Sequence, residues 1–234
     1  MVTRPKRSLW KDYGVAIGVA VAVAFGIRAV GIEAYRIPTR AMSPALEPGD
    51  TIFVAKWPFG LQLPFFDDPV TRGRMPHRGE VILYSPGPDY TRYFLKRVVA
   101  LPGEIVQVRK GRLLINGREL PMGNPVAGCG MESHPDGVSY TICRENPPLE
   151  DFGPEKVAEG SVFVLGDFRS QAVPGSVSPV EPRAKARSWG PVKRDELRGS
   201  ALWIWMSVRP RALGEEQKGL FPQLRLERMF RRIP

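Results

Sequence analysis

Lys96 is the residue of this sequence best suited to acid–base chemistry. It lies in Tyr93–Val99, a run of mostly apolar residues. In an extended strand, side chains alternate between two faces, so Lys96 shares a face with Phe94 and Val98. Arg97 then occupies the opposite face. Burial between two large apolar groups disfavours the ammonium form, and a neutral lysine can take a proton from a nucleophile. A lysine that protects an exposed edge strand is the alternative.

Two cysteines and two histidines are the other side chains with reactive groups. Cys129 and Cys143 lie fourteen residues apart in a stretch rich in Gly and Pro. In an exported domain, a disulfide closing such a loop would contribute about 3 kcal/mol, and two unpaired buried thiols are the alternative. His77 and His134 form no ligand spacing with the cysteines, so we expect no metal site and no cofactor.

The N-terminal region has the pattern of a membrane anchor. Residues 13–32 contain a single charge, Arg28, and as a helix they would span about 30 Å, the thickness of a hydrocarbon core. Basic residues precede them, which predicts a cytoplasmic N-terminus in residues 1–12 and an exported remainder in residues 33–234. A cleaved signal peptide and a buried helix of a soluble protein are the alternatives.

The net charge of +10 raises the question of nucleic-acid binding. The basic residues are dispersed, and they cluster only at the two ends of the chain, where they suit anionic lipid head groups. Membrane contact is therefore expected and nucleic-acid binding is not. These clusters are Arg4, Lys6, Arg7 and Lys11 at the N-terminus and Arg225, Arg228, Arg231 and Arg232 at the C-terminus.

Beyond residue 32 the sequence predicts a mainly β domain with antiparallel strands. Short apolar or alternating runs are separated by turns rich in Gly and Pro. Lys110-Gly111 and Asn116-Gly117 have the composition of hairpin turns, the second typical of type I′. Residues 170–188 are rich in Pro, Ser, Ala and basic residues and are expected to form a flexible loop. The expected strands are Glu80–Tyr84, Tyr93–Ala100, Ile105–Arg109, Arg112–Ile115, Ser161–Leu165 and Ala201–Met206.

Four segments of the sequence, the first of which is Ile37–Leu46, resemble the type I signal peptidases, membrane-bound serine/lysine proteases that remove signal peptides. Ile37–Leu46 reads IPTRAMSPAL. It is similar to the family's nucleophile loop, Pro-Ser/Thr-x-Ser-Met-x-Pro followed by Leu and Gly-Asp. Phe94–Glu104 resembles the strand and turn that carry the family's lysine, and Arg78–Ile82 resembles its Arg-Gly-Asp-Ile/Val-Val strand. The stretch Gln223–Arg228 resembles the family's final strand.

The resemblance implies a role for each matched residue. Lys96 would be the general base, and Ala41 stands where the family has its serine nucleophile. Thr39 would assist the backbone N–H of residue 41 in an oxyanion hole, and an ordinary turn residue is the alternative. Four apolar residues correspond to shallow pockets for small side chains before the scissile bond, although each is equally readable as core: Ile37, Met42, Leu46 and Leu95. Some members of the family also have a disulfide in a region comparable to Cys129–Cys143.

The third block of the family is altered. Gly166-Asp167-Phe168-Arg169 matches its start, but seventeen residues separate Arg169 from Arg187-Ser188-Trp189-Gly190. Lys185-Ala186 stands where the family has Asp-Ser. Asp167, Arg169 and Arg187 are the expected structural supports of the base. Ser170 or Ser188 could replace the serine that orients the lysine.

Ala41 leaves the activity open, because a methyl group cannot attack a carbonyl. The chain could be an engineered inactive form or a natural divergent member, or Ser43 could attack instead. The expected function is a signal peptidase of the cytoplasmic membrane, acting on signal peptides of exported preproteins and impaired as written. The alternatives are a non-catalytic paralogue that binds export substrates or regulates an active peptidase, and an unrelated membrane-anchored β domain.

Overall fold

The computed structural model describes residues 13–20, 31–60, 71–86, 93–146, 148–170, 189–210 and 223–234. Residues 13–20 are helical. None of the helices in these ranges is both long enough and apolar enough to cross a membrane. The expected anchor falls partly on residues 21–30, which lie outside the described residues, as do residues 171–188 of the expected loop. Strand β1 begins at Ile32, the last residue of that expected anchor.

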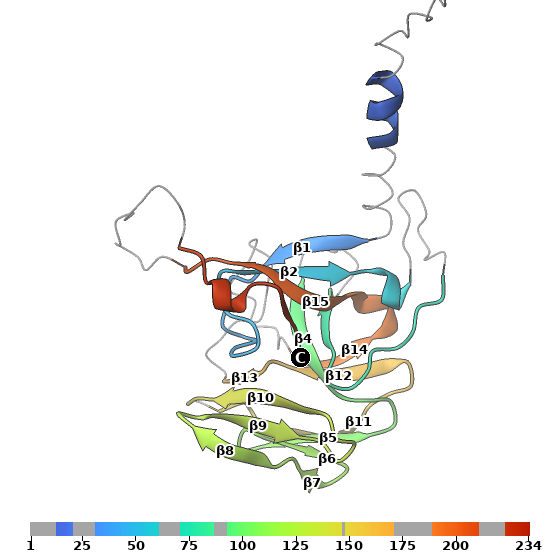
Figure 1. The fold of residues 1–234 in the computed structure, drawn as a ribbon. Helices are drawn as coiled ribbons and strands as arrows, with labels where there is room; N and C mark the ends of the chain where they lie inside the picture. The colour runs from blue at the N-terminus through green and yellow to red at the C-terminus, as the bar shows by residue number, and fades with distance from the viewer. Residues whose placement is uncertain are drawn as a thin grey trace, which may run out of the picture.

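The described part of the chain is built from three β-sheets (Figure 1). The main sheet has eight strands in the order β1-β2-β15-β3-β4-β12-β14, with β16 paired to β15. Its strands are β1 Ile32–Arg36, β2 Asp50–Ala55, β3 Val81–Tyr84, β4 Phe94–Ala100, β12 Ser161–Leu165, β14 Gly190–Lys193, β15 Leu197–Ser207 and β16 Arg231–Arg232.

Two four-stranded sheets lie on one side of the main sheet (Figure 1). One has the order β11-β5-β6-β7 and the other the order β13-β10-β9-β8. The first comprises β5 Ile105–Arg109, β6 Arg112–Ile115, β7 Arg118–Glu119 and β11 Phe152–Lys156. The second comprises β8 Met122–Val126, β9 Cys129–Ser133, β10 Ser139–Arg144 and β13 Phe168–Arg169. Short 3-10 helices are η1 Trp57–Phe59, η2 Arg194–Glu196 and η3 Leu226–Arg228.

The mainly antiparallel β architecture predicted from the sequence is confirmed. The strand pairs of the main sheet are all antiparallel among the described residues, and β10 with β13 is a parallel pair. Both predicted hairpin turns have positive φ at their two central residues, as type I′ turns require: 50° and 71° at Lys110-Gly111, and 52° and 77° at Asn116-Gly117. The strand predicted at Ala201–Met206 is longer in the structure, where β15 begins at Leu197. It bends at bulges in its pairing with β2 and β3.

Candidate active site

Lys96 lies in the interior of the main sheet. Its strand β4 pairs with β3 on one side and with β12 on the other, and Lys96 is directly opposite Ile82. This interior position excludes the edge-strand interpretation. Phe94 and Val98 belong to a buried cluster on the face predicted for Lys96. Lys96 itself is 3% exposed.

Burial lowers the pKa of Lys96 from about 10.5 to about 8. Two neighbouring charges act in opposite directions: the Asp167 carboxylate raises this pKa, and the Arg169 guanidinium lowers it. A lysine with this pKa is partly neutral near pH 8. It can therefore accept a proton, which an ordinary surface lysine does poorly at that pH.

The loop that carries Ala41 is held by its own apolar side chains. Ile37, Met42 and Leu46 are each at most 2% exposed and belong to one buried cluster with Leu95 of β4. This packing joins the loop to the strand residue next to Lys96. The four predicted pocket residues are thus gathered in one place, as members of the core.

Backbone hydrogen bonds fix the ends of the same loop. The Ile37 N–H donates to Asp50 O at 2.8 Å, and the Gly49 N–H donates to Ile37 O at 2.9 Å. Ser43 is 3% exposed, and its hydroxyl is directed at Leu46 O, 3.5 Å away within the loop. Thr39 is half-buried on this loop, two residues before Ala41.

Gly166 lies where the loop and the lysine come together. A methyl group added at Gly166 would stand 2.4 Å from Ala41 O and 3.2 Å from Lys96 Nζ. The Phe168 N–H donates to Ala41 O at 3.2 Å, and the Arg40 guanidinium lies 4.8 Å from the Phe168 ring centre. The absence of a side chain at Gly166 therefore lets Ala41 and Lys96 border the same small space.

Asp167 is buried against the far side of β4. Its carboxylate accepts two hydrogen bonds from Arg97, from Nε at 2.8 Å and from Nη2 at 2.6 Å. The two side chains are 0% and 1% exposed. A bidentate, buried pair of this kind has little freedom of orientation. It joins the residue after Gly166 to the residue after Lys96.

The three predicted supports have different positions. Asp167 pairs with Arg97, and Arg169 pairs with Glu132 of β9, with Nη2 to Oε1 at 2.7 Å. Arg187 and Ser188 lie outside the described residues, whereas Ser170 is buried. Sequence reasoning missed Arg97 and Glu132 as partners. Arg97 follows the base directly, which was a usable signal, but nothing local singled out Glu132.

Cys129 and Cys143 form a disulfide between directly opposed positions of β9 and β10, with an S–S distance of 2.00 Å. The Cys143 N–H donates to Asp167 O at 2.9 Å. The cross-linked hairpin is therefore bonded to the turn that follows Gly166. No group of His, Cys, Asp and Glu able to hold a metal ion occurs among the described residues.

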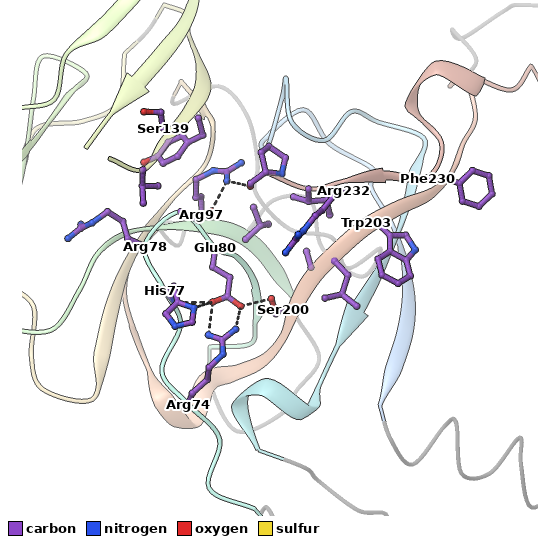
Figure 2. Close-up of a pocket in the computed structure, with 18 residues that line it drawn as sticks. Arg74, His77, Arg78, Glu80, Arg97, Ser139, Ser200, Trp203, Phe230 and Arg232 are labelled. Atoms are coloured by element: carbon purple, nitrogen blue, oxygen red, sulfur yellow. Dashed lines mark hydrogen bonds and ion pairs between the residues drawn. The ribbon is translucent and has the colours of Figure 1, made fainter. Parts of the chain in front are cut away.

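A cavity of about 630 Å³ opens on the other side of β4 (Figure 2). It is lined by Arg97 and by a cluster in which Glu80 accepts hydrogen bonds from Arg74 and Ser200. Neither Lys96 nor Ala41 lines it. We place the candidate site at Ala41, Lys96 and Gly166, because the group able to take a proton is there.

An antiparallel β domain that buries a lysine of lowered pKa beside a loop backbone has the makeup expected of a lysine-dependent peptidase. Residues 10–206 match the family model described as signal peptidase, peptidase S26. This match covers most of the sequence, and the chain belongs to the signal peptidase S26 family. This match excludes the interpretation of the chain as an unrelated membrane-anchored β domain.

Several relatives carry the name signal peptidase I. The protein of Leptolyngbya laminosa is 33% identical over 193 residues, which cover 80% of this chain and 74% of the relative. That of Pseudomonas fluorescens is 29% identical over 212 residues, covering 86% and 74%. A crystal structure of a signal peptidase I from Enterococcus faecalis is 26% identical, covers 54% of this chain and 97% of its own, and has a TM-score of 0.30.

Proposed function

We propose that this chain has the site of a serine/lysine signal peptidase in which the nucleophile is missing. The observation that carries the proposal is the placement of Lys96 Nζ and Ala41 O around Gly166. A serine at position 41 would lie on the loop next to Lys96. The neutral form of this lysine could then accept the proton of the serine hydroxyl. The family match supports the same role, because the relatives named above are signal peptidases.

The chemistry at this site follows from the positions of the groups. Neutral Lys96 would take the proton of a hydroxyl at position 41, and the oxygen would attack the carbonyl carbon of a scissile peptide bond. The resulting oxyanion would be held by the backbone N–H of residue 41 and by the Thr39 hydroxyl, with each donor contributing roughly 3 to 4 kcal/mol. With Ala41 no such attack occurs, and loss of a serine nucleophile costs about 10⁶ in rate.

A binding role for exported preproteins is the second candidate function. It is favoured by Ala41 itself, which is 3% exposed in a loop that Ile37, Met42 and Leu46 pack into the core without a serine at this position. The altered third block, with seventeen residues between Arg169 and Arg187, supports divergence beyond a single substitution. A chain of this kind would hold signal peptides or regulate an active peptidase.

We further propose that the chain is anchored in the cytoplasmic membrane by residues 13–32, with residues 1–12 inside and the β domain outside. The basic C-terminal cluster contributes less to lipid contact than its sequence indicates. Arg225 and Arg228 donate to the buried carboxylate of Asp50, at 3.0 and 2.7 Å. Arg231 and Arg232 are exposed and are left to face anionic head groups.

The test restores the missing hydroxyl. Ala41→Ser in the full chain, reconstituted in lipid vesicles, should cleave a preprotein at its signal peptide at least about 10³-fold faster than the Ala41 chain. The rate should rise with pH through about 8 and level off above it, because the neutral form of Lys96 is required. Ala41→Ser with Lys96→Met is the matched control and should remain inactive.

The outcomes separate the two candidate functions. An inert Ala41→Ser chain that still binds preprotein would support the binding role and contradict the peptidase site. Absence of both cleavage and binding would remove both functions. Cleavage that survives Lys96→Met would show that another group acts as the base.

A further inference from the structure

A chain of buried polar groups leads from β9 to the candidate active site, and the chemistry proposed above does not use it. Glu132 is 0% exposed. Its Oε1 accepts from Arg169 Nη2 at 2.7 Å and from the Tyr140 hydroxyl at 3.2 Å. The Tyr140 hydroxyl in turn lies 2.7 Å from His134 Nε2. Glu132 is therefore the acceptor on which these side chains converge.

Arg169 continues the chain toward the site. Its Nε donates to Gly166 O at 2.7 Å, and the side chain is 1% exposed. Gly166 is the residue that borders both Lys96 Nζ and Ala41 O. Two hydrogen bonds thus connect the Glu132 carboxylate to the backbone against which the catalytic lysine packs. A change in the position of Arg169 would be transmitted to this backbone.

The hairpin that carries Glu132 is held in place independently. Cys129 and Cys143 are bonded across it, and Cys143 N–H donates to Asp167 O. Glu132 is directly opposite Tyr140 in the register of β9 and β10. The Glu132 carboxylate therefore has a fixed position relative to residues 166–169, which favours a positioning role over a mobile surface pair.

Charge gives this contact an effect beyond packing. Arg169 lowers the pKa of Lys96, so its positive charge acts at the base. Glu132 is the carboxylate that partly offsets that charge. His134 has its pKa lowered to about 4 by burial and is neutral at ordinary pH. Removal of either partner from a buried ion pair leaves the other uncompensated.

We propose that Glu132 is a positioning residue for the Lys96 site: it holds Arg169 on the Gly166 carbonyl and sets how much of the Arg169 charge acts on the lysine. This inference rests on the proposed function, because it assigns Lys96 the role of base. Two charged groups act on Lys96, Asp167 after β12 and Arg169 of β13. The groups that act on Arg169 are Glu132, Tyr140 and Asp167.

The test measures the pKa of Lys96 in the Ala41 chain, where no activity is needed. The full chain in micelles, labelled with ¹³C-lysine, is titrated by NMR, and Lys96→Met assigns the signal. Glu132→Gln should lower the pKa of Lys96 by about half a pH unit or more. That is the effect expected if Arg169, no longer held by the Glu132 carboxylate, acts on the lysine with more of its positive charge. Glu132→Asp keeps the charge and should retain most of the original value.

A second variant isolates the route through Arg169. Arg169→Gln with Glu132→Gln carries no unpaired buried charge, and its Lys96 pKa should match that of Arg169→Gln alone. Glu119→Gln, at an exposed pair with Arg112, is the control and should leave the titration unchanged. Circular dichroism melting shows whether each variant folds. An unchanged or raised pKa in folded Glu132→Gln, or an equal effect with and without Arg169, would overturn the proposal.

Cleavage gives an independent readout in the Ala41→Ser chain. In that chain, Glu132→Gln should shift the acid limb of the pH–rate profile to lower pH by the same amount. It should also reduce the plateau rate at least tenfold. An inert Ala41→Ser chain whose Lys96 titration still responds to Glu132→Gln would contradict the peptidase function and leave the positioning role standing. Normal cleavage by the Ala41→Ser chain, together with a Lys96 titration that does not respond to Glu132→Gln, would support the peptidase function and contradict the positioning role.

Discussion

Lys96 approaches the Gly166 backbone closely because Gly166 has no side chain: the lysine Nζ lies 3.2 Å from the position that a Cβ at residue 166 would occupy. A real Cβ would be closer still to Ala41 O, at 2.4 Å. The candidate site is therefore shaped by backbone on one side. A residue with any side chain at position 166 cannot be accommodated without displacing the loop or the lysine.

Gly166→Ala should accordingly destabilise the fold by about 1 to 3 kcal/mol, the usual cost of overpacking a core. Urea denaturation of the full chain measures the loss. Gly123→Ala is a useful comparison, since Gly123 does not have positive φ and the nearest atom to its Cβ position is Met131 O at 3.9 Å. A Gly166→Ala chain as stable as the parent, with an unshifted loop, would contradict the contact described here.

Lys96→Met should stabilise the protein at pH 7. The pKa of Lys96 falls from about 10.5 to about 8 on burial, so the unfolded chain binds more protons between these values and stability rises with pH there. The penalty for burying the charge is thus complete below pH 8 and amounts to roughly 3 kcal/mol. Denaturation at pH 7 and at pH 10 should show the advantage of Lys96→Met shrinking as pH rises.

Lys156→Met, an exposed replacement on β11, is the control for a general effect of removing a positive charge. If Lys96→Met were less stable than the parent at pH 7, the lysine would be making a favourable ionic contact, and its role as a partly neutral base would be lost.

Asp167→Asn should be strongly destabilising, by about 3 to 5 kcal/mol, because Arg97 would remain buried without its carboxylate. The same change should lower the pKa of Lys96 further, since Asp167 raises it. Thermal melting and the Lys96 titration measure the two effects separately. Arg97→Met combined with Asp167→Asn removes both charges and should recover part of the stability. Failure to recover any would indicate that the pair is not the main role of Asp167.

The parts of this fold that were predicted from sequence are those with local signals. The alternation of side chains in β4 predicted which face Lys96 occupies. The Gly residues after Lys110 and Asn116 predicted the hairpin turns, where φ is positive in the structure. Strands β8, β9 and β11 were not foreseen, because each contains Gly and lacks an apolar or alternating run. In β9 the carboxylate of Glu132 is buried while Met131 is 53% exposed.

The sequence indicated Asp167 and Arg169 as supports of the candidate site, but not their ion-pair partners Arg97 and Glu132. Arg97 and Asp167 are seventy positions apart in the chain, and Glu132 and Arg169 are thirty-seven apart. Ion pairs over such separations leave no periodic pattern. They follow from the register of β4 with β12 and from the parallel pairing of β10 with β13, which only the three-dimensional fold supplies.

The position of β15 bears on the order in which the domain can form. This strand lies between β2 and β3, so the loop that carries Ala41 and the strand that carries Lys96 belong to two halves of the main sheet that β15 joins. Residues 197–207 are near the end of the chain. β1 and β2 are therefore fixed relative to β3, β4 and β12 only once β15 has paired with both halves of the sheet. Contacts between distant segments form late, so the candidate site is complete only after residues 197–207 have joined the sheet.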